Sequence, residues 1–152
     1  MSPEHQASNI ASWDSLAAFV QSFPDESWTG WKALAERFIA VGREHSLHEY
    51  FRAGQSMHDF LFSTAVTHDL PLDAPKVRVN LHPPDRLTLS YEPGIPAAGA
   101  DTKLEYTLSF DDAVPTFRRF LNHLWTMTTS EAIPHLIRAP AASFLAPALP
   151  QQ

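Results

Sequence analysis

The chain contains no cysteine, and this absence limits the sites that it can form. Neither a disulfide framework nor a thiolate metal site is available, so any bound metal would need histidine and carboxylate ligands. Long apolar runs are also absent, and none approaches the ~20 residues that a membrane-spanning helix needs. The first residues lack the basic and apolar regions of a secretory signal. Together these absences predict a cytoplasmic protein without membrane contact.

Basic residues are scarce. Lys and Arg number 11 against 17 Asp and Glu, which gives a formal net charge of −6 with the eight histidines neutral. A nucleic-acid binder needs a concentrated basic surface, and the only adjacent basic pair is Arg118 and Arg119. We therefore expect no nucleic-acid partner, whereas an acidic balance suits attraction to a basic protein.

The first third of the chain has a helical pattern. A length of 152 residues with 44% hydrophobic and 18% charged side chains is typical of one folded domain. Residues 1–11 are polar and aperiodic, so we expect a flexible N-terminal tail there. Apolar side chains then recur with helical spacing over residues 12–23, and again from residue 25 or 27 to residue 42 or 45.

The stretch from residue 47 to residue 67 allows two interpretations. Its apolar residues keep a helical period, but Gly54 interrupts them. Ser56 and Asp59 match the Ser-x-x-acid signature that opens a helix, which predicts a helix over residues 57–66. Residues 50–51 form a short strand in the alternative interpretation.

From residue 76 the period changes from 3.6 to 2. Residues 76–82, 86–92 and 103–110 alternate apolar and polar side chains, as half-buried strands do. The short connection at residues 83–85 predicts an antiparallel hairpin between the first two strands. Asp111 or Asp112 then caps a last helix. The pattern predicts an α+β fold, a two-layer sandwich in which helices cover one face of a three-stranded antiparallel meander.

The C-terminal residues 134–152 are rich in Ala and Pro and lack a clear period. We expect an extended tail that packs on the domain or docks on a partner. The predicted organisation is thus a tail over residues 1–11, one α+β domain over residues 12–133 and a second tail.

One cluster of residues suggests metal chemistry. Nitrogen and oxygen ligands gather between residues 45 and 69, and the candidates are His45, His48, His58, His68 and Asp59. Their spacing matches no known ligand motif. A metal-dependent hydrolase is therefore the alternative hypothesis, and the structural interpretation places His45 at a helix C-terminus, where the dipole favours a protonated ring.

Two shorter segments carry reactive side chains. Ser56, His58 and Asp59 are the residue types of a catalytic triad, but adjacent residues on a helix diverge, and helix capping explains the serine. Arg52 and Gln55 form a polar break that suits a carboxylate, a phosphate or a polar ligand, although arginine pairs more often with a nearby acid such as Glu49. No Gly-rich phosphate loop is present, so no cofactor is predicted.

Aromatic residues are abundant, with four Trp, ten Phe and three Tyr. Most fall on predicted core stripes, and those that fall off them are candidates for a contact surface. The candidates are Phe19, Trp28, Phe120 and Phe144, with Leu145 beside the last. The polar face of the sheet is interpreted as an ordinary solvated surface. The leading hypothesis is a non-catalytic protein-interaction module, such as an immunity-type inhibitor, an adaptor or an accessory subunit, that binds another protein.

Overall fold

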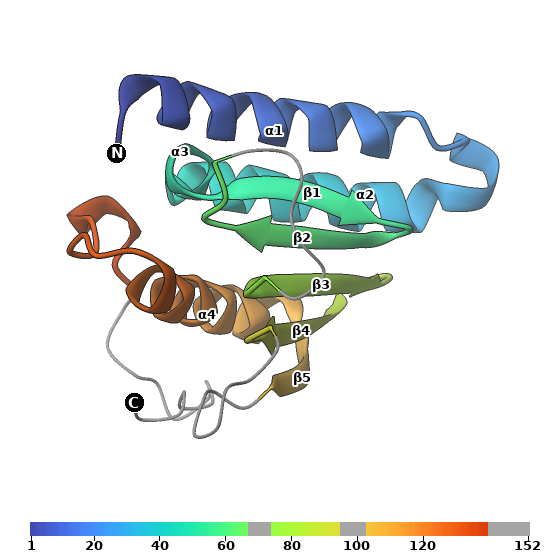
Figure 1. Cartoon of the computed structure of the whole chain (residues 1–152). Coiled ribbons are helices and arrows are strands. Elements are labelled where there is room, and N and C mark those ends of the chain that lie inside the picture. The colour runs from blue at the N-terminus through green and yellow to red at the C-terminus, as the bar shows by residue number, and fades with distance from the viewer. Residues whose placement is uncertain (67–73, 95–102, 140–152) are drawn as a thin grey trace.

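The computed structural model describes residues 1–66, 74–94 and 103–139. Within them, helices precede and follow a five-stranded antiparallel sheet whose strand order is β1-β2-β3-β4-β5 (Figure 1). The helices are α1 (Pro3–Gln21), α2 (Asp25–Glu44), α3 (Leu47–Tyr50) and α4 (Phe110–Thr128), with a 3-10 turn at His135–Ile137. The strands are β1 (Arg52–Ser56), β2 (Asp59–Ser63), β3 (Lys76–His82), β4 (Arg86–Glu92) and β5 (Leu104–Ser109). The α+β architecture is confirmed, and the predicted strand number of three is wrong.

The additional strands occupy the segment that was predicted to be helical. Ser56 pairs with Asp59 across a two-residue turn, so the Ser-x-x-acid signature closes a hairpin here and does not cap a helix. Phe60 and Phe62 are fully buried, and Leu61 between them points to the other face. Two apolar residues at a period of 2 outweigh the local capping signature because they complete the core face of the sheet.

The three predicted strands form β3, β4 and β5 at nearly the expected bounds. Val79 pairs with Leu89, which pairs in turn with Tyr106, so apolar side chains share one face of the sheet. The last helix begins at Phe110, where the hydroxyl of Ser109 accepts a hydrogen bond from the Asp112 N–H. This cap lies two or three residues before the predicted Asp111 or Asp112.

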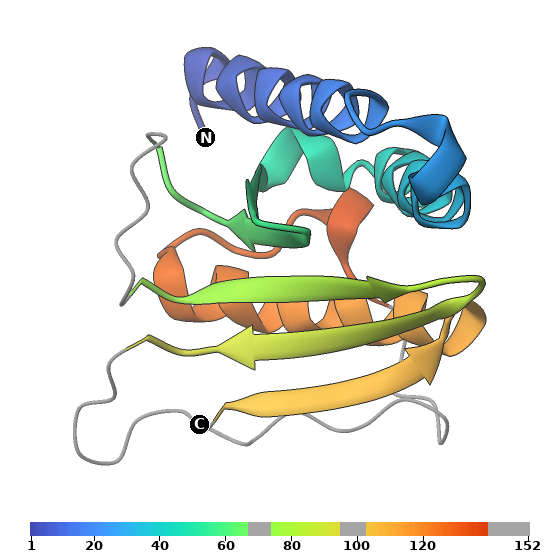
Figure 2. The ribbon, with the colours of Figure 1, turned by 90° about the vertical axis from the view of Figure 1, so that its right-hand side faces the viewer.

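Helices α2 and α4 cover the apolar face of the sheet. The ring of Phe38 on α2 lies 6.0 Å from that of Phe62 on β2 and 4.8 Å from that of Phe117 on α4. In the part of the chain that the structure describes, no helix covers the opposite face, and Figure 2 shows this face toward the viewer with α4 behind the sheet. The prediction that helices cover one face of the sheet therefore holds for α2 and α4.

Helix α1 has a different position, along the edge of the sheet beside β1 (Figure 1). The hydroxyl of Ser12 accepts a hydrogen bond from the Ala53 N–H at 2.9 Å, and the indole of Trp13 donates to the Phe51 carbonyl at 2.9 Å. Covering a strand edge in this way blocks further strand pairing. The fold therefore differs from a simple two-layer sandwich.

The predicted N-terminal tail is helical from Pro3 onward. Its first turn is capped by the hydroxyl of Ser2, and Asn9 is fully buried where its side-chain amide donates to the Glu49 carbonyl at 3.1 Å. The period was not visible in the sequence because the buried side of this segment includes polar residues. Residues 1–11 thus belong to the domain.

The segment that follows α4, including the start of the predicted C-terminal tail, packs on α4. The indole of Trp125 donates to the Glu131 carbonyl at 3.0 Å, and the Asn122 amide donates to the Ile137 carbonyl at 2.8 Å. Ile137 is fully buried. The remainder of the predicted tail, residues 140–152, lies outside the described residues. In the described part of the chain, no helix is long and apolar enough to cross a membrane.

Candidate functional site

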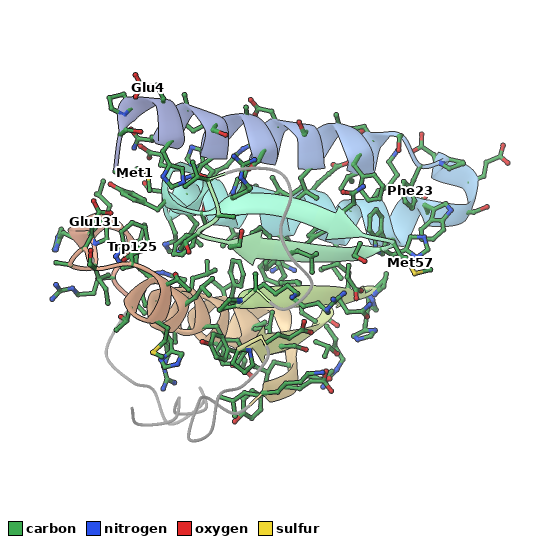
Figure 3. All side chains as sticks on the ribbon, viewed as in Figure 1. Met1, Glu4, Phe23, Met57, Trp125 and Glu131 are labelled. Atoms are coloured by element: carbon green, nitrogen blue, oxygen red, sulfur yellow. The ribbon has the colours of Figure 1, made fainter. Side chains whose placement is uncertain are left out.

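Several chain connections bring aromatic residues together at one end of the sheet. Phe23 lies in the turn between α1 and α2, Trp28 and Trp31 lie in the first turns of α2, and Met57 and His58 form the β1–β2 turn. Figure 3 shows Phe23 and Met57 at this end, opposite Trp125 and Glu131. We call the five residues Phe23, Trp28, Trp31, Met57 and His58 the aromatic end.

The rings of the aromatic end are in direct contact. Phe23 stacks on Trp31 with a centroid distance of 4.8 Å and meets Trp28 edge-on at 4.7 Å. The imidazole of His58 lies 4.7 Å from Trp28, which connects the β1–β2 turn to α2. Trp31 in turn contacts Phe60 of the sheet at 5.9 Å. These offset and edge-to-face contacts hold the rings in one arrangement.

Exposure increases from the base of the aromatic end to its tip. Trp31 is 7% exposed and belongs to the core, Phe23 and Trp28 are partly buried, and His58 is exposed. Met57 is 84% exposed, the highest value among the exposed large hydrophobic residues of the described chain. The apolar side chain of Met57 is thus exposed to solvent beside a set of packed aromatic rings.

The backbone of Met57 is also unusual. Its φ angle is 56°, in the left-handed region where a side chain costs roughly 1–2 kcal/mol. Two-residue hairpin turns usually place Gly or Asn in such positions. Strain of this kind in a large apolar residue is a recurrent feature of functional sites.

Arg52 and Gln55 lie in a different place, a groove of about 430 Å³ between α1 and β1. The guanidinium of Arg52 is only slightly exposed and donates to the carbonyls of Ala65 and Val66 at 3.2 and 2.9 Å, and to the hydroxyl of Ser8. Burial lowers its pKa from the usual arginine value. Arg52 therefore joins β1 to the end of β2 and to α1, and its predicted local partner Glu49 instead accepts from Gln6.

The predicted metal ligands are not brought together by the fold. His45 caps the end of α2, His48 packs edge-on against Trp13 at 6.3 Å, and His58 belongs to the aromatic end. His68 lies outside the described residues. In the described ranges, no three His, Asp or Glu side chains are placed to share a metal ion.

The side chains of His45 and Asp59 have separate structural partners. Burial lowers the pKa of His45, the charge of Arg118 lowers it further, and Glu44 opposes both effects. The expected protonation of this ring by the helix dipole is therefore outweighed. Asp59 points to the open face of the sheet, where it bonds to Arg78 at 3.1 Å and to the amide of Asn80. His58 and Asp59 thus diverge, and with Ser56 they form no triad.

The open face of the sheet is a connected polar surface. Arg78 bridges Asp59 and Glu92, the hydroxyl of Ser90 donates to Glu105 at 2.9 Å, and the hydroxyls of Thr88 and Thr107 lie 2.8 Å apart. These pairs satisfy one another. Lys76 and Ser90 on this face are only 5% and 2% exposed, so this part of the face is not the ordinary solvated surface that was expected.

The structure places the predicted contact residues in different environments. Trp28 lies in the aromatic end, and Phe19 lies 5.0 Å from Phe23 beside it. Phe120 is fully buried between Tyr91 and Tyr106, which excludes it from an exposed contact surface. Phe144 and Leu145 lie outside the described residues. Sequence reasoning missed Met57, whose exposure follows only once Ser56 and Asp59 are recognised as a hairpin pair.

Comparisons of this chain with protein-family models, curated proteins and solved structures give no match.

Proposed function

We propose that this chain is a non-catalytic protein-interaction module that binds another protein through the aromatic end. The observation that supports the proposal is the 84% exposure of Met57 above a packed base of aromatic rings. Methionine and aromatic residues are enriched where proteins meet. An immunity-type inhibitor, an adaptor and an accessory subunit all share this mode of action, and the cytoplasm is the proposed location.

The construction of the aromatic end favours tight association. Trp28 and Phe23 are held by neighbouring rings, so their side chains lose little conformational freedom when a partner binds. Energetically important interface residues are commonly aromatic and are surrounded by contacts that exclude water. Met57 is flexible and polarisable, and its side chain can adjust to the shape of a partner.

Affinity capture from the native cell tests the proposal. The wild-type chain is expected to retain a stoichiometric partner, and Met57→Asn to lose at least about tenfold in affinity because a polar amide would replace the apolar side chain in the contact. Asn tolerates the left-handed backbone better than Met, so the variant is expected to remain folded. A thermal melt checks this point.

Leu136→Asn is the matched control, since Leu136 is 60% exposed and lies on the 3-10 turn after α4. This variant is expected to keep the partner. Absence of any stoichiometric partner, or equal losses in the two variants, would contradict the proposed function.

A further inference from the structure

The charges around the aromatic end indicate the kind of partner. We infer that this surface binds a cationic segment of another protein, one that presents Lys or Arg side chains around an apolar side chain. The inference rests on the proposed function and adds the charge of the partner. Three observations support it: acidic side chains at this end, the ion pairs of Lys32 and Arg37 within the chain, and the partly exposed rings of Phe23 and Trp28.

Acidic side chains border the aromatic end. Asp25 and Glu26 lie in the first turn of α2 beside Trp28, and the side chain of Asp25 is 84% exposed. Asp85 lies in the β3–β4 turn, and this turn is close to α2 because Pro83 lies 3.4 Å from the Cβ position of Gly30. Glu26 and Asp85 are exposed as well. The chain as a whole carries a formal charge of −6.

The cations at this end have partners within the chain. Lys32 is 8% exposed, and its ammonium donates to Asp25 at 2.6 Å and to the Phe23 carbonyl at 3.1 Å. The guanidinium of Arg37 lies 3.8 Å from the centre of the Phe110 ring. Arg86 donates to the Thr107 carbonyl at 3.4 Å. Arg86 is exposed and keeps its charge, whereas Lys32 and Arg37 are paired with Asp25 and Asp111. Glu26 and Asp85 have no ion-pair partner among the described residues, so negative charge predominates at this end.

The partly exposed rings of Phe23 and Trp28 suit the same partner. Lys and Arg side chains bind to the faces of Trp and Phe, and they bind most strongly to Trp. Arg37 and Phe110 show this contact inside the protein. A second copy of the chain would bring Asp25, Glu26 and Asp85 against the same residues, and like charges in contact oppose such a pairing. A cationic segment with an apolar side chain for Met57 satisfies both the charges and the rings.

Two short amphipathic peptides test the inference by calorimetric titration. They share the same leucine positions, and one carries lysine where the other carries glutamate. The lysine peptide is expected to bind at least about tenfold more tightly than the glutamate peptide. Glu26→Gln/Asp85→Asn is expected to weaken the lysine peptide by about fivefold.

Glu4→Gln/Glu44→Gln is the matched control, because it changes the net charge equally and places both changes away from the aromatic end; Glu4 is labelled in Figure 3 at the opposite end. It is expected to change the affinity for the lysine peptide less than twofold, or about 0.4 kcal/mol. Equal weakening by both double variants would show that net charge alone causes binding, and this result would overturn the inference.

Three other results would overturn it as well: no binding of the lysine peptide, equal binding of the two peptides, or a dimer in sedimentation that Met57→Asn disrupts. The proposed function is tested separately. If partner capture still depends on Met57 while the peptides are not distinguished, the surface binds a protein but not a cationic segment. If capture does not depend on Met57, the proposed function fails too.

Discussion

The imidazole of His58 packs against the indole of Trp28 with 4.7 Å between the ring centroids. This contact joins the β1–β2 turn to α2, two elements that are distant in the sequence. Because Trp31 continues the contact to Phe60, the turn is connected to the core of the domain. The exposed Met57 therefore stands on a base that is part of the hydrophobic core.

The backbone of Met57 predicts a change in stability. Met57→Gly is expected to have a free energy of unfolding about 0.5–1 kcal/mol higher than Met57→Ala, because glycine adopts a positive φ without steric cost. Urea denaturation of both variants measures the difference. The glycine variant is also expected to bind its partner less tightly, since the exposed side chain is lost. A glycine variant that is less stable than the alanine variant would contradict the assignment of strain.

Substitution by alanine is expected to affect stability strongly at one glycine and hardly at another. A Cβ at Gly42 would lie 2.5 Å from two ring atoms of Trp13, which is fully buried and held by its hydrogen bond to Phe51. Gly42→Ala is therefore expected to lower the free energy of unfolding by about 1–3 kcal/mol. A Cβ at Gly54 meets nothing within 4 Å. Gly54→Ala is therefore expected to change the free energy of unfolding by less than about 0.5 kcal/mol. Similar values for both variants would contradict this packing of α1 on α2.

The side chain of Asn122 predicts how firmly the segment after α4 is held. Its amide donates to the Ile137 carbonyl at 2.8 Å, and its oxygen accepts from the Ala139 N–H. Asn122→Ala is expected to lower the free energy of unfolding by about 1–3 kcal/mol, because the Ile137 carbonyl and the Ala139 N–H each lose a hydrogen bond. It is also expected to speed hydrogen exchange over residues 131–139. The exposed Thr126 on the same helix offers a control, and Thr126→Ala is expected to leave that exchange unchanged. Unchanged exchange in the Asn122 variant would refute the docking of this segment.

The lowered pKa of His45 predicts a dependence of stability on pH. Burial and Arg118 disfavour the protonated ring in the folded state, whereas the unfolded chain titrates near the usual value of about 6.5. The unfolded state thus binds more protons, and the contribution is complete above about pH 6.5 and falls as the pH drops toward the lower folded pKa. His45→Gln is expected to reduce the loss of stability between about pH 7 and 5. The same slope in wild type and variant would contradict this account.

The sequence predicted the regions in which local pattern and tertiary environment agree. Strands β3, β4 and β5 were found because each has several apolar residues at a period of 2. Strand β2 has only Phe60 and Phe62 on its buried face, and the signature at Ser56 and Asp59 favoured a helix.

The start of α1 and the aromatic end could be recognised only from the tertiary structure. The first turns of α1 bury Asn9 and Ser12 through hydrogen bonds to other elements, and such partners leave no apolar period in the sequence. Trp28 was named as a contact candidate because it was expected to fall off the predicted core stripes. Met57 was not, because its exposure depends on the pairing of β1 with β2.

Hydrogen exchange of the chain with and without its captured partner tests the central claim most directly. The account predicts that binding slows exchange at residues 23–31 and 56–59, where the aromatic end is formed. Protection confined to the open sheet face around Arg78 and Ser90, with no change at the aromatic end, would contradict it.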